Sequence, residues 1–572
     1  MIVRVVVDVP AISRQFDYSV PTGSEGRVAV GTMVRVPLHG RRVAGWVTEL
    51  DVEAPEGVVI QPVSKISGVG PSPEMIELCR WAAWRWAGRL PQFLSAASPP
   101  KMVPSIGSPR PGARPTTASA SVAELFTRRR SVFRLPPAGD PLEVVIAAAS
   151  LGDALVICPS VAQAGTVARR LRATGVSVAL HPHDWARAAA GGATVVGARA
   201  AAFAPMANLA AVVVLDESDE ALQSEGSPTW HAREVVLERA RRANVPAVMV
   251  SATPSLESTA RSPLVTLDRA AERSGWPVVE VVDRRDEDLV RTGLYSQTLV
   301  DRLRAASSAV CVLNRTGRSS LLACRTCGTI TCCERCDSAV VMAGSDHLDC
   351  RRCGLQRPVI CQACGAMAMK NLRVGVSRAS EELAALLGEP VTEISGSTTD
   401  FRATRVMVGT EAILHRVRDI STVAFLEFDQ ELMAPRYRAW EQALGLVARA
   451  GRLVGGRSGR VILQTRDPEH TVIRAAVAAD PSILSVAEAA RRELTGFPPA
   501  RTVAVIGGSA AEEFVARLGA PLGVEIGRGD GDHWLARSAD RGALLDALAA
   551  VERPAGRLRL QIDPARLPDQ HG

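Results

Sequence analysis

Ten of the twelve cysteines of this 572-residue chain fall in one short segment, between Cys311 and Cys364. Eight of them form four Cys-x-x-Cys pairs. The pairs are Cys324/Cys327, Cys333/Cys336, Cys350/Cys353 and Cys361/Cys364. Each pair can offer two thiolates to one ion, and two pairs complete a tetrahedral zinc site. The segment therefore predicts two closed, structural zinc sites, and the spacing alone leaves three ways of pairing open.

A second group of candidate residues follows an apolar run of strand length, residues 211–215. Asp216 and Glu217 come next, where a Walker B motif carries the Asp that orients Mg²⁺ and the Glu that activates water. Further short sequences follow at strand ends in the order found in superfamily-2 helicases. They are residues 251–257, residues 408–410, and residues 448–452 with the candidate arginine fingers Arg449 and Arg452. Their order predicts two helicase-type lobes.

The chain has no Walker A phosphate loop. That loop requires a Lys between Gly and Ser or Thr, because its ammonium group reaches the β- and γ-phosphates. The only lysines are Lys65, Lys101 and Lys370, and none stands in that context. The helicase outline therefore lacks the residue that holds the nucleotide.

Apolar strand-like runs alternate with helical segments through the middle of the chain. The runs are residues 154–158, 211–215 and 247–250, then 405–408, 423–426 and 461–463. Helical patterns lie between them, for example at residues 161–173 and 232–242. This alternation predicts parallel sheets covered by helices, in two α/β lobes.

The expected domains follow from these patterns and from changes in composition. They are a small β-rich N-terminal domain (1–98), a Pro/Gly/Ser-rich linker (99–130), a first lobe (131–265), a connection with the start of the second lobe (266–322), the two-zinc insertion (323–370), the remainder of the second lobe (371–484) and an α+β C-terminal domain (485–572). A chain of this length is too long for one hydrophobic core.

The composition and charge of the chain exclude some classes of protein. No run approaches 18 uncharged apolar residues, which excludes a membrane span, and residues 1–8 have a strand pattern and not that of a signal peptide. The net charge of +7 permits a polyanionic partner. We therefore expect a cytoplasmic protein, associated with the nucleoid and not with a membrane.

Several short sequences, spread over nearly the whole chain, resemble the primosomal protein N′ (PriA) family of replication-restart factors. They are residues 16–18 with 34–37, 197–199, 203–205, 231–233, 313–315, the four cysteine pairs, 435–439 with Glu441, and 497–499. The resemblance implies a multidomain α/β fold. It consists of a small β-rich N-terminal DNA-binding domain, two RecA-like helicase lobes, a Cys-rich zinc insertion and an α+β C-terminal domain.

The resemblance also implies roles for individual residues. Phe16, Asp17 and Gly40 would bind the 3′ end of a nascent DNA strand, with Phe16 stacked on the base and Asp17 accepting a hydrogen bond from the 3′-hydroxyl. The alternative is that Phe16 belongs to the core and Asp17 caps a turn. In the family the outer cysteine pairs share one zinc ion and the inner pairs share the other. By resemblance, Cys324, Cys327, Cys361 and Cys364 form one site, and Cys333, Cys336, Cys350 and Cys353 the second.

The chain departs from the family where ATP would bind. Residues 134–141 replace the P-loop, Asp219 stands where the acidic motif has His, and Gly445 replaces a Gln. The Lys of the aromatic-rich loop is missing at residues 221–224, and the winged helix is reduced to the linker and residues 128–130. We expect degenerate lobes in which Asp216, Glu217, Arg449 and Arg452 are vestigial and no residue is catalytic. ATP and Mg²⁺ are in doubt as cofactors, whereas two Zn²⁺ per chain are expected.

The function expected from the resemblance is replication restart. The protein would recognise abandoned forks and promote reloading of the replicative helicase without helicase activity of its own. Its expected partners are forked and single-stranded DNA, the replicative helicase with its loading machinery, and single-stranded-DNA-binding protein. Two alternatives remain open: an active ATP-dependent 3′–5′ helicase with an unrecognised phosphate site, and a zinc-stabilised assembly protein that binds no DNA.

Overall fold

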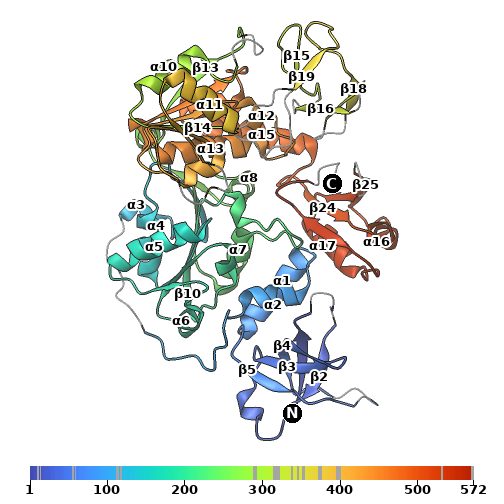
Figure 1. Cartoon of the computed structure of the whole chain (residues 1–572). Helices are drawn as coiled ribbons and strands as arrows, with labels where there is room; N and C mark the ends of the chain where they lie inside the picture. The colour runs from blue at the N-terminus through green and yellow to red at the C-terminus, as the bar shows by residue number, and fades with distance from the viewer. Residues whose placement is uncertain are drawn as a thin grey trace.

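The computed structural model describes residues 1–9, 12, 14–53, 57, 59–110, 115, 119–287, 293–313, 322–335, 339–343, 347–350, 355–371, 376–394, 398, 401–529 and 533–567. Figure 1 shows a small sheet at the N-terminus, two larger α/β lobes stacked above it, and a C-terminal domain beside them. The predicted multidomain α/β fold is confirmed. Among the described residues, no helix has the length and apolar character needed to cross a membrane.

The N-terminal sheet is antiparallel, with its strands in the order β2-β1-β4-β3-β5. Its elements are β1 (Ile2–Val7), β2 (Phe16–Ser19), η1 (Glu25–Arg27), β3 (Met33–Leu38), β4 (Arg41–Leu50) and β5 (Lys65–Gly68), followed by α1 (Pro73–Arg85) and α2 (Leu90–Ala97). Alternate valines such as Val3, Val5, Val34 and Val36 are buried on one face. This period of two is the pattern of a half-buried strand.

Aromatic side chains join the N-terminal domain to the first lobe. The ring centroid of Phe93 on α2 lies 6.4 Å from that of Trp86 and 5.8 Å from that of Phe203 in the first lobe. Trp46 of β4 donates its indole N–H to Ser98 Oγ at 2.8 Å, directly after α2. The two helices therefore fix the small sheet against the lobe.

Lobe 1 (residues 130–266) is a seven-stranded parallel sheet with helices on both faces. The strand order is β12-β6-β11-β10-β7-β9-β8. Its elements, after the linker helix α3 (Ala120–Glu124), are β6 (Arg130–Arg134), α4 (Leu142–Leu151), β7 (Asp153–Ile157), α5 (Val161–Ala173), β8 (Val178–Leu180), α6 (Trp185–Ala190), β9 (Thr194–Gly197), η2 (Arg199–Phe203), β10 (Leu209–Leu215), η3 (Glu220–Leu222), α7 (Ala232–Ala243), β11 (Ala247–Ser251), α8 (Leu256–Thr259) and β12 (Leu264–Thr266).

Lobe 2 (residues 269–313 and 376–495) is a six-stranded parallel sheet in the order β13-β23-β22-β14-β21-β20. Its elements are α9 (Arg269–Ser274), β13 (Val278–Asp283), α10 (Gln297–Ala305), β14 (Ala309–Val312), α11 (Val376–Leu387), β20 (Val391–Ile394), β21 (Val406–Gly409), η4 (Glu411–His415), β22 (Thr422–Phe425), α12 (Asp429–Leu432), α13 (Ala439–Leu453), η5 (Gly456–Ser458), β23 (Arg460–Thr465), α14 (Thr471–Ala478) and α15 (Ser482–Thr495). The cysteine-rich segment interrupts this lobe between β14 and α11.

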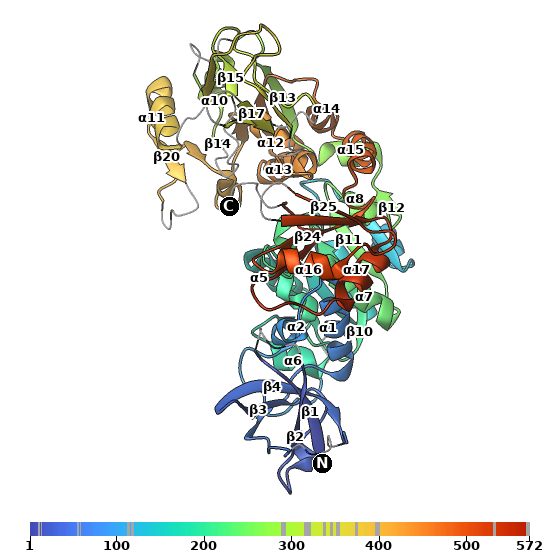
Figure 2. The same cartoon turned by 90° about the vertical axis from the view of Figure 1, so that its right-hand side faces the viewer.

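The cysteine-rich segment and the C-terminal domain are built on short antiparallel strands, and Figure 2 shows them from the side. The segment holds β15 (Leu322–Cys324) paired with β19 (Met369–Asn371), and a sheet of β16 (Val340–Ala343), β17 (His347–Cys350) and β18 (Gln356–Pro358). The C-terminal sheet has the order β25-β26-β24-β27. Its elements are β24 (Thr502–Gly507), α16 (Ala511–Leu518), β25 (Glu525–Arg528), β26 (His533–Ser538), α17 (Arg541–Ala550) and β27 (Arg559–Ile562).

The helix α15 runs across residue 485, which the sequence predicts as the start of the C-terminal domain. Its residue Leu484 is buried in the same core as the strands of lobe 2. The C-terminal sheet itself begins at Thr502. The helix that crosses residue 485 therefore packs against lobe 2.

Candidate functional site

The loop after β6, residues 135–142, stands by the family resemblance where a phosphate loop is expected, but it has few N–H groups to offer. Three of its residues are proline, which has no N–H. Four other N–H groups donate within the protein: Leu135 to Ser251 O (3.1 Å), Ala138 to Gly275 O (3.0 Å), Gly139 to Pro136 O (2.8 Å) and Leu142 to Asp140 Oδ1 (3.0 Å). Because a phosphate cradle is built from available backbone donors, this loop is poorly suited to hold a nucleotide.

The same loop packs closely against segments that belong to lobe 2. A Cβ added to Gly275 would lie 2.6 Å from Pro136 Cβ, and one added to Gly456 would lie 2.8 Å from Ala138 Cβ. Real Cβ atoms do not approach so closely, so both positions require glycine. The loop therefore serves as a contact surface between the lobes.

The acidic residue after β10 is paired with an arginine of the other lobe. Arg452 on α13 contacts Asp216 with both terminal nitrogens, at 2.6 and 2.9 Å, and donates from Nε to Pro137 O at 3.2 Å. Arg449, one turn earlier, contacts Asp219 at 3.1 Å. Burial raises the pKa of Asp216, but the charge of Arg452 and the hydrogen bonds from Arg452 and Gln163 together outweigh burial, so the pKa is lowered. The candidate arginine fingers thus bind the candidate metal-orienting carboxylate and its neighbour.

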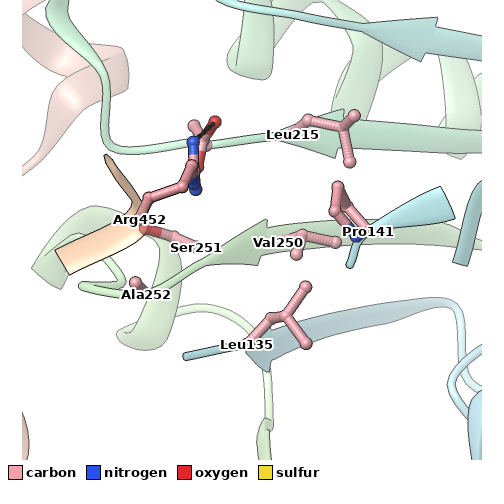
Figure 3. Close-up of a pocket in the computed structure, with 8 residues that line it drawn as sticks. Leu135, Pro141, Leu215, Val250, Ser251, Ala252 and Arg452 are labelled. Atoms are coloured by element: carbon pink, nitrogen blue, oxygen red, sulfur yellow. Dashed lines mark hydrogen bonds and ion pairs between the residues drawn. The ribbon is translucent and has the colours of Figure 1, made fainter. Parts of the chain in front are cut away.

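Little space remains beside this pair. The hollow there holds about 230 Å³ of empty volume, part of it open to solvent, and is lined by residues that include Leu135, Pro141, Leu215 and Val250. Figure 3 shows these apolar side chains gathered on one side of the hollow, with Arg452 on the other side. A nucleotide would have to displace the Arg452 contact.

Glu217, the candidate water-activating residue, is fully buried inside lobe 1. Its carboxylate accepts hydrogen bonds from Arg233 Nη1 at 2.7 Å, from the Ser255 N–H at 2.7 Å and from Ser258 Oγ at 2.6 Å. These partners satisfy the buried charge. Glu217 therefore ties α7 to α8 and does not face solvent.

A second group of ion pairs between the lobes was missed by the sequence analysis. Arg492 on α15 is 1 % exposed and contacts Glu257 on α8 at 3.2 Å, as well as Glu441 on α13. Arg438 contacts the same Glu257 at 2.7 Å. Burial raises the pKa of Glu257, but the nearby charges of Arg438, Arg492 and Arg233 together outweigh burial, so the pKa is lowered and the carboxylate remains charged. Residues 251–257 and 435–439 were singled out as motifs, but nothing in the sequence pairs them with Arg492.

The outer cysteine pairs come together in space. The Sγ atoms of Cys324, Cys327, Cys361 and Cys364 all lie within 4.8 Å of one another. The Cys324–Cys364 and Cys327–Cys361 Sγ separations are both 3.6 Å. A tetrahedron with Zn–S bonds of about 2.3 Å has edges of about 3.8 Å. The donor set and its geometry therefore fit a zinc ion, although other thiophilic ions share this chemistry.

The inner cysteine pairs are described only in part. Cys333 and Cys350 are buried in the small core of the cysteine-rich segment, whereas Cys336 and Cys353 lie outside the described residues. The second predicted metal site therefore stays a prediction.

The three residues expected to bind a 3′ end lie in the N-terminal sheet. The ring of Phe16 packs partly against the core of this domain and has the guanidinium of Arg14 over it, 4.8 Å from its centroid. Asp17 lies within β2, and its carboxylate pairs with Arg4 Nε at 3.0 Å. Gly40 is exposed in the β3–β4 turn with φ +75°. Strand register places Phe16 beside Val5 and, one strand further, level with Val47, which is seven residues along the chain from Gly40.

The N-terminal domain is similar to a known DNA-binding module. A family model described as the PriA 3′DNA-binding domain (3′BD) matches residues 4–99.

Curated relatives named Replication restart protein PriA confirm the resemblance that the motifs predicted. The protein from Bacillus subtilis is 30% identical over 360 residues, which cover 56% of this chain and 44% of the relative. That from Treponema pallidum is 34% identical over 340 residues (53% and 50%), and that from Haemophilus influenzae 27% over 365 residues (58% and 50%). The chain spans about half the length of the curated relatives it matches.

One similar solved structure is a variant of Dbp5 from S. cerevisiae bound to RNA and ADP BeF3. It is 12% identical, with a TM-score of 0.33 over 61% of this chain and 82% of that one. A likeness at this level carries no argument.

Metal analysis tests the cysteine sites. We expect close to two zinc ions per chain, falling to about one in Cys361→Ser, because metal binding in such segments is coupled to folding. Cys79→Ser, which changes a buried cysteine of α1 far from the segment, should leave the count unchanged. A count near zero in protein prepared without chelators would contradict both sites.

Hydrogen exchange tests the contact between the lobes. Arg452→Gln removes the ion pair with Asp216 and weakens the contact with the 135–142 loop at Pro137 O. Amide hydrogen exchange in that loop should therefore become several-fold faster. Since the pKa of Asp216 is lowered, the pair is intact at neutral pH and is lost only as the pH falls below about 4. Arg241→Gln, which loses an ion pair with Glu238 within α7, is the matched control. Unchanged exchange in Arg452→Gln would show that the pair does not hold the loop.

Proposed function

We propose that this chain is a replication-restart protein that binds abandoned forks and promotes reloading of the replicative helicase, without hydrolysing ATP. The family match of residues 4–99 and the PriA relatives support the restart role and DNA binding. The two parallel sheets are then degenerate RecA-like lobes. The proposed cofactors are two structural zinc ions, held by the outer and the inner cysteine pairs.

One observation supports the proposal that the protein does not hydrolyse ATP. In an active helicase, the residues at the positions of Asp216 and Arg452 would bind Mg²⁺ and the γ-phosphate. In this chain, Asp216 and Arg452 bind each other. Phosphoryl transfer depends on positioned charges around the transferring group. A site whose charges are already paired and whose loop donors are used elsewhere offers little such stabilisation.

The partners and location of the protein are part of the same proposal. Forked and single-stranded DNA, the replicative helicase with its loading machinery, and single-stranded-DNA-binding protein are the partners that a restart role requires. A protein with these partners works in the cytoplasm at the nucleoid.

An ATPase assay tests the degenerate core. We expect the rate of ATP hydrolysis with fork DNA to equal the rate without protein. Asp216→Asn, which removes the carboxylate that would orient Mg²⁺, should leave this baseline unchanged. Glu217→Gln is a poor probe, because it disturbs a fully buried ion pair and would destabilise lobe 1. A DNA-stimulated rate that disappears in Asp216→Asn would favour an active helicase instead.

Binding to matched DNA ends tests the 3′-end site. A carboxylate accepts a hydrogen bond from a 3′-hydroxyl and repels a 3′-phosphate, so we expect about tenfold tighter binding to the hydroxyl end, about 1.4 kcal/mol. Asp17→Ala should abolish this preference and leave general binding nearly intact.

Glu49→Ala is the control for this measurement. Glu49 also pairs with Arg4, at 2.8 Å, so its removal disturbs the same arginine but keeps Asp17. The preference should survive in this variant. Equal affinity of the unchanged protein for both ends would contradict the 3′-end site, and no binding to fork DNA at physiological salt would favour an assembly protein without a DNA role.

A further inference from the structure

The last strand of the chain, β27, is bound along its free edge by side chains of lobe 1. It is an edge strand, since it pairs only with β24 in the C-terminal sheet. Alternate residues of an antiparallel edge strand turn their backbone groups outward, and these groups need other partners. Leu560 O accepts a hydrogen bond from Ser227 Oγ at 2.5 Å, and Ile562 O accepts one from Thr229 Oγ1 at 2.7 Å. Two hydroxyl groups of lobe 1 thus take the place of a neighbouring strand.

The residues directly after β27 continue these contacts and reach both lobes. Asp563 O accepts a hydrogen bond from Gln223 Nε2 of lobe 1 at 2.7 Å. Pro564 O, one residue further, accepts a hydrogen bond from the Tyr437 hydroxyl of lobe 2 at 3.0 Å. We call residues 560–566 the C-terminal latch. Consecutive carbonyl groups of the latch therefore bind donors that belong to different lobes.

The donors that bind the latch are buried and are themselves fixed in place. Gln223 and Tyr437 both lie in the interior. The Gln223 amide oxygen accepts a hydrogen bond from Arg438 Nη1 of lobe 2 at 3.1 Å, and the Tyr437 ring is stacked on that of Phe497 with 4.9 Å between the centroids. A buried donor that loses its acceptor is costly. The lobes therefore cannot separate at this place without leaving polar groups of the latch unpaired.

Asp563 anchors the latch to two further parts of the molecule. Its carboxylate accepts hydrogen bonds from the Val503 N–H of β24 at 2.9 Å and from Arg85 Nη2 of α1 at 3.1 Å. Its backbone has φ +45°, in the left-handed region that Asp tolerates better than most residues. A residue is held in that region only where its surroundings fix it. The latch thus has a fixed base at Asp563, from which it contacts both lobes.

We infer that the C-terminal latch holds lobe 1 and lobe 2 in one relative orientation, and that its release frees lobe 2 to move. The pairs made by Arg452 and Arg492 join the lobes directly, whereas the latch joins them through the C-terminal domain, which lies beside both (Figure 1). No nucleotide takes part, because the chain's own groups make every contact. The last contact of the latch, between Arg566 and Glu220 at 3.1 Å, is half exposed. Release therefore begins at that end.

Hydrogen exchange separates a hold on the lobes from local packing of the latch. The Ala138 N–H of lobe 1 donates to Gly275 O, at the start of lobe 2, and lies outside the latch. In Tyr437→Phe, which loses only a hydroxyl group, we expect exchange to become about fivefold faster both in the latch and at Ala138. Arg559→Gln changes an exposed side chain of the same strand and should leave both rates unchanged. Faster exchange in the latch alone would overturn the inference.

The distance between the lobes supplies a second readout. Fluorescent labels carried by non-natural amino acids at positions 169 and 474, which are exposed on α5 and α14, report this distance in single molecules. We expect one narrow distribution for the unchanged chain and a broader one for Gln223→Ala/Tyr437→Phe, which removes one donor from each lobe. Arg559→Gln should keep the narrow distribution. A distribution that stays narrow in the double variant would show that the latch does not hold the lobes.

Discussion

The arrangement of the two lobes depends on charges that meet where their sheets face each other. Arg452 reaches from lobe 2 to Asp216, and Arg438 and Arg492 converge on Glu257 of lobe 1. Asp216 comes directly after β10, and Glu257 lies on the short helix α8. The arginines lie on α13 (Arg452), directly before α13 (Arg438) and on α15 (Arg492). Because the buried members satisfy one another, the lobes have one favourable arrangement, and separating them would leave charges without partners. The closely packed loop at residues 135–142 is held by the same contacts.

Much of the fold could be predicted from local pattern. The apolar run 211–215 falls within β10, and the helical pattern 161–173 coincides with α5. The prolines at residues 136 and 137 predicted a loop with few free N–H groups, and four other N–H groups of this loop donate within the protein. The proximity of Cys324, Cys327, Cys361 and Cys364 agrees with the pairing that the family resemblance implied, although spacing alone allowed three pairings. Local composition carried these predictions because each depends on residues close together in the chain.

Contacts between distant segments could not be predicted in this way. Asp216 and Arg452 are 236 residues apart, and nothing in either segment indicates its partner. Arg4 illustrates the same limit, since a single arginine in an apolar strand does not reveal that it pairs with Asp17 and Glu49. Such features are decided by the topology of the sheets and become visible only in three dimensions.

The pair between Arg452 and Asp216 has a consequence for energy supply under the proposed function. Helicases draw directional motion from a fuel molecule that enters between two lobes, changes charge and leaves. When the protein's own side chains fill that place, no fuel molecule binds between the lobes and leaves again in a cycle. Each step at a fork would then run on the free energy of association alone, so the order of events would come from competition among partners. The time spent on DNA would be set by dissociation, and ionic strength would regulate it more strongly than the cellular ratio of ATP to ADP.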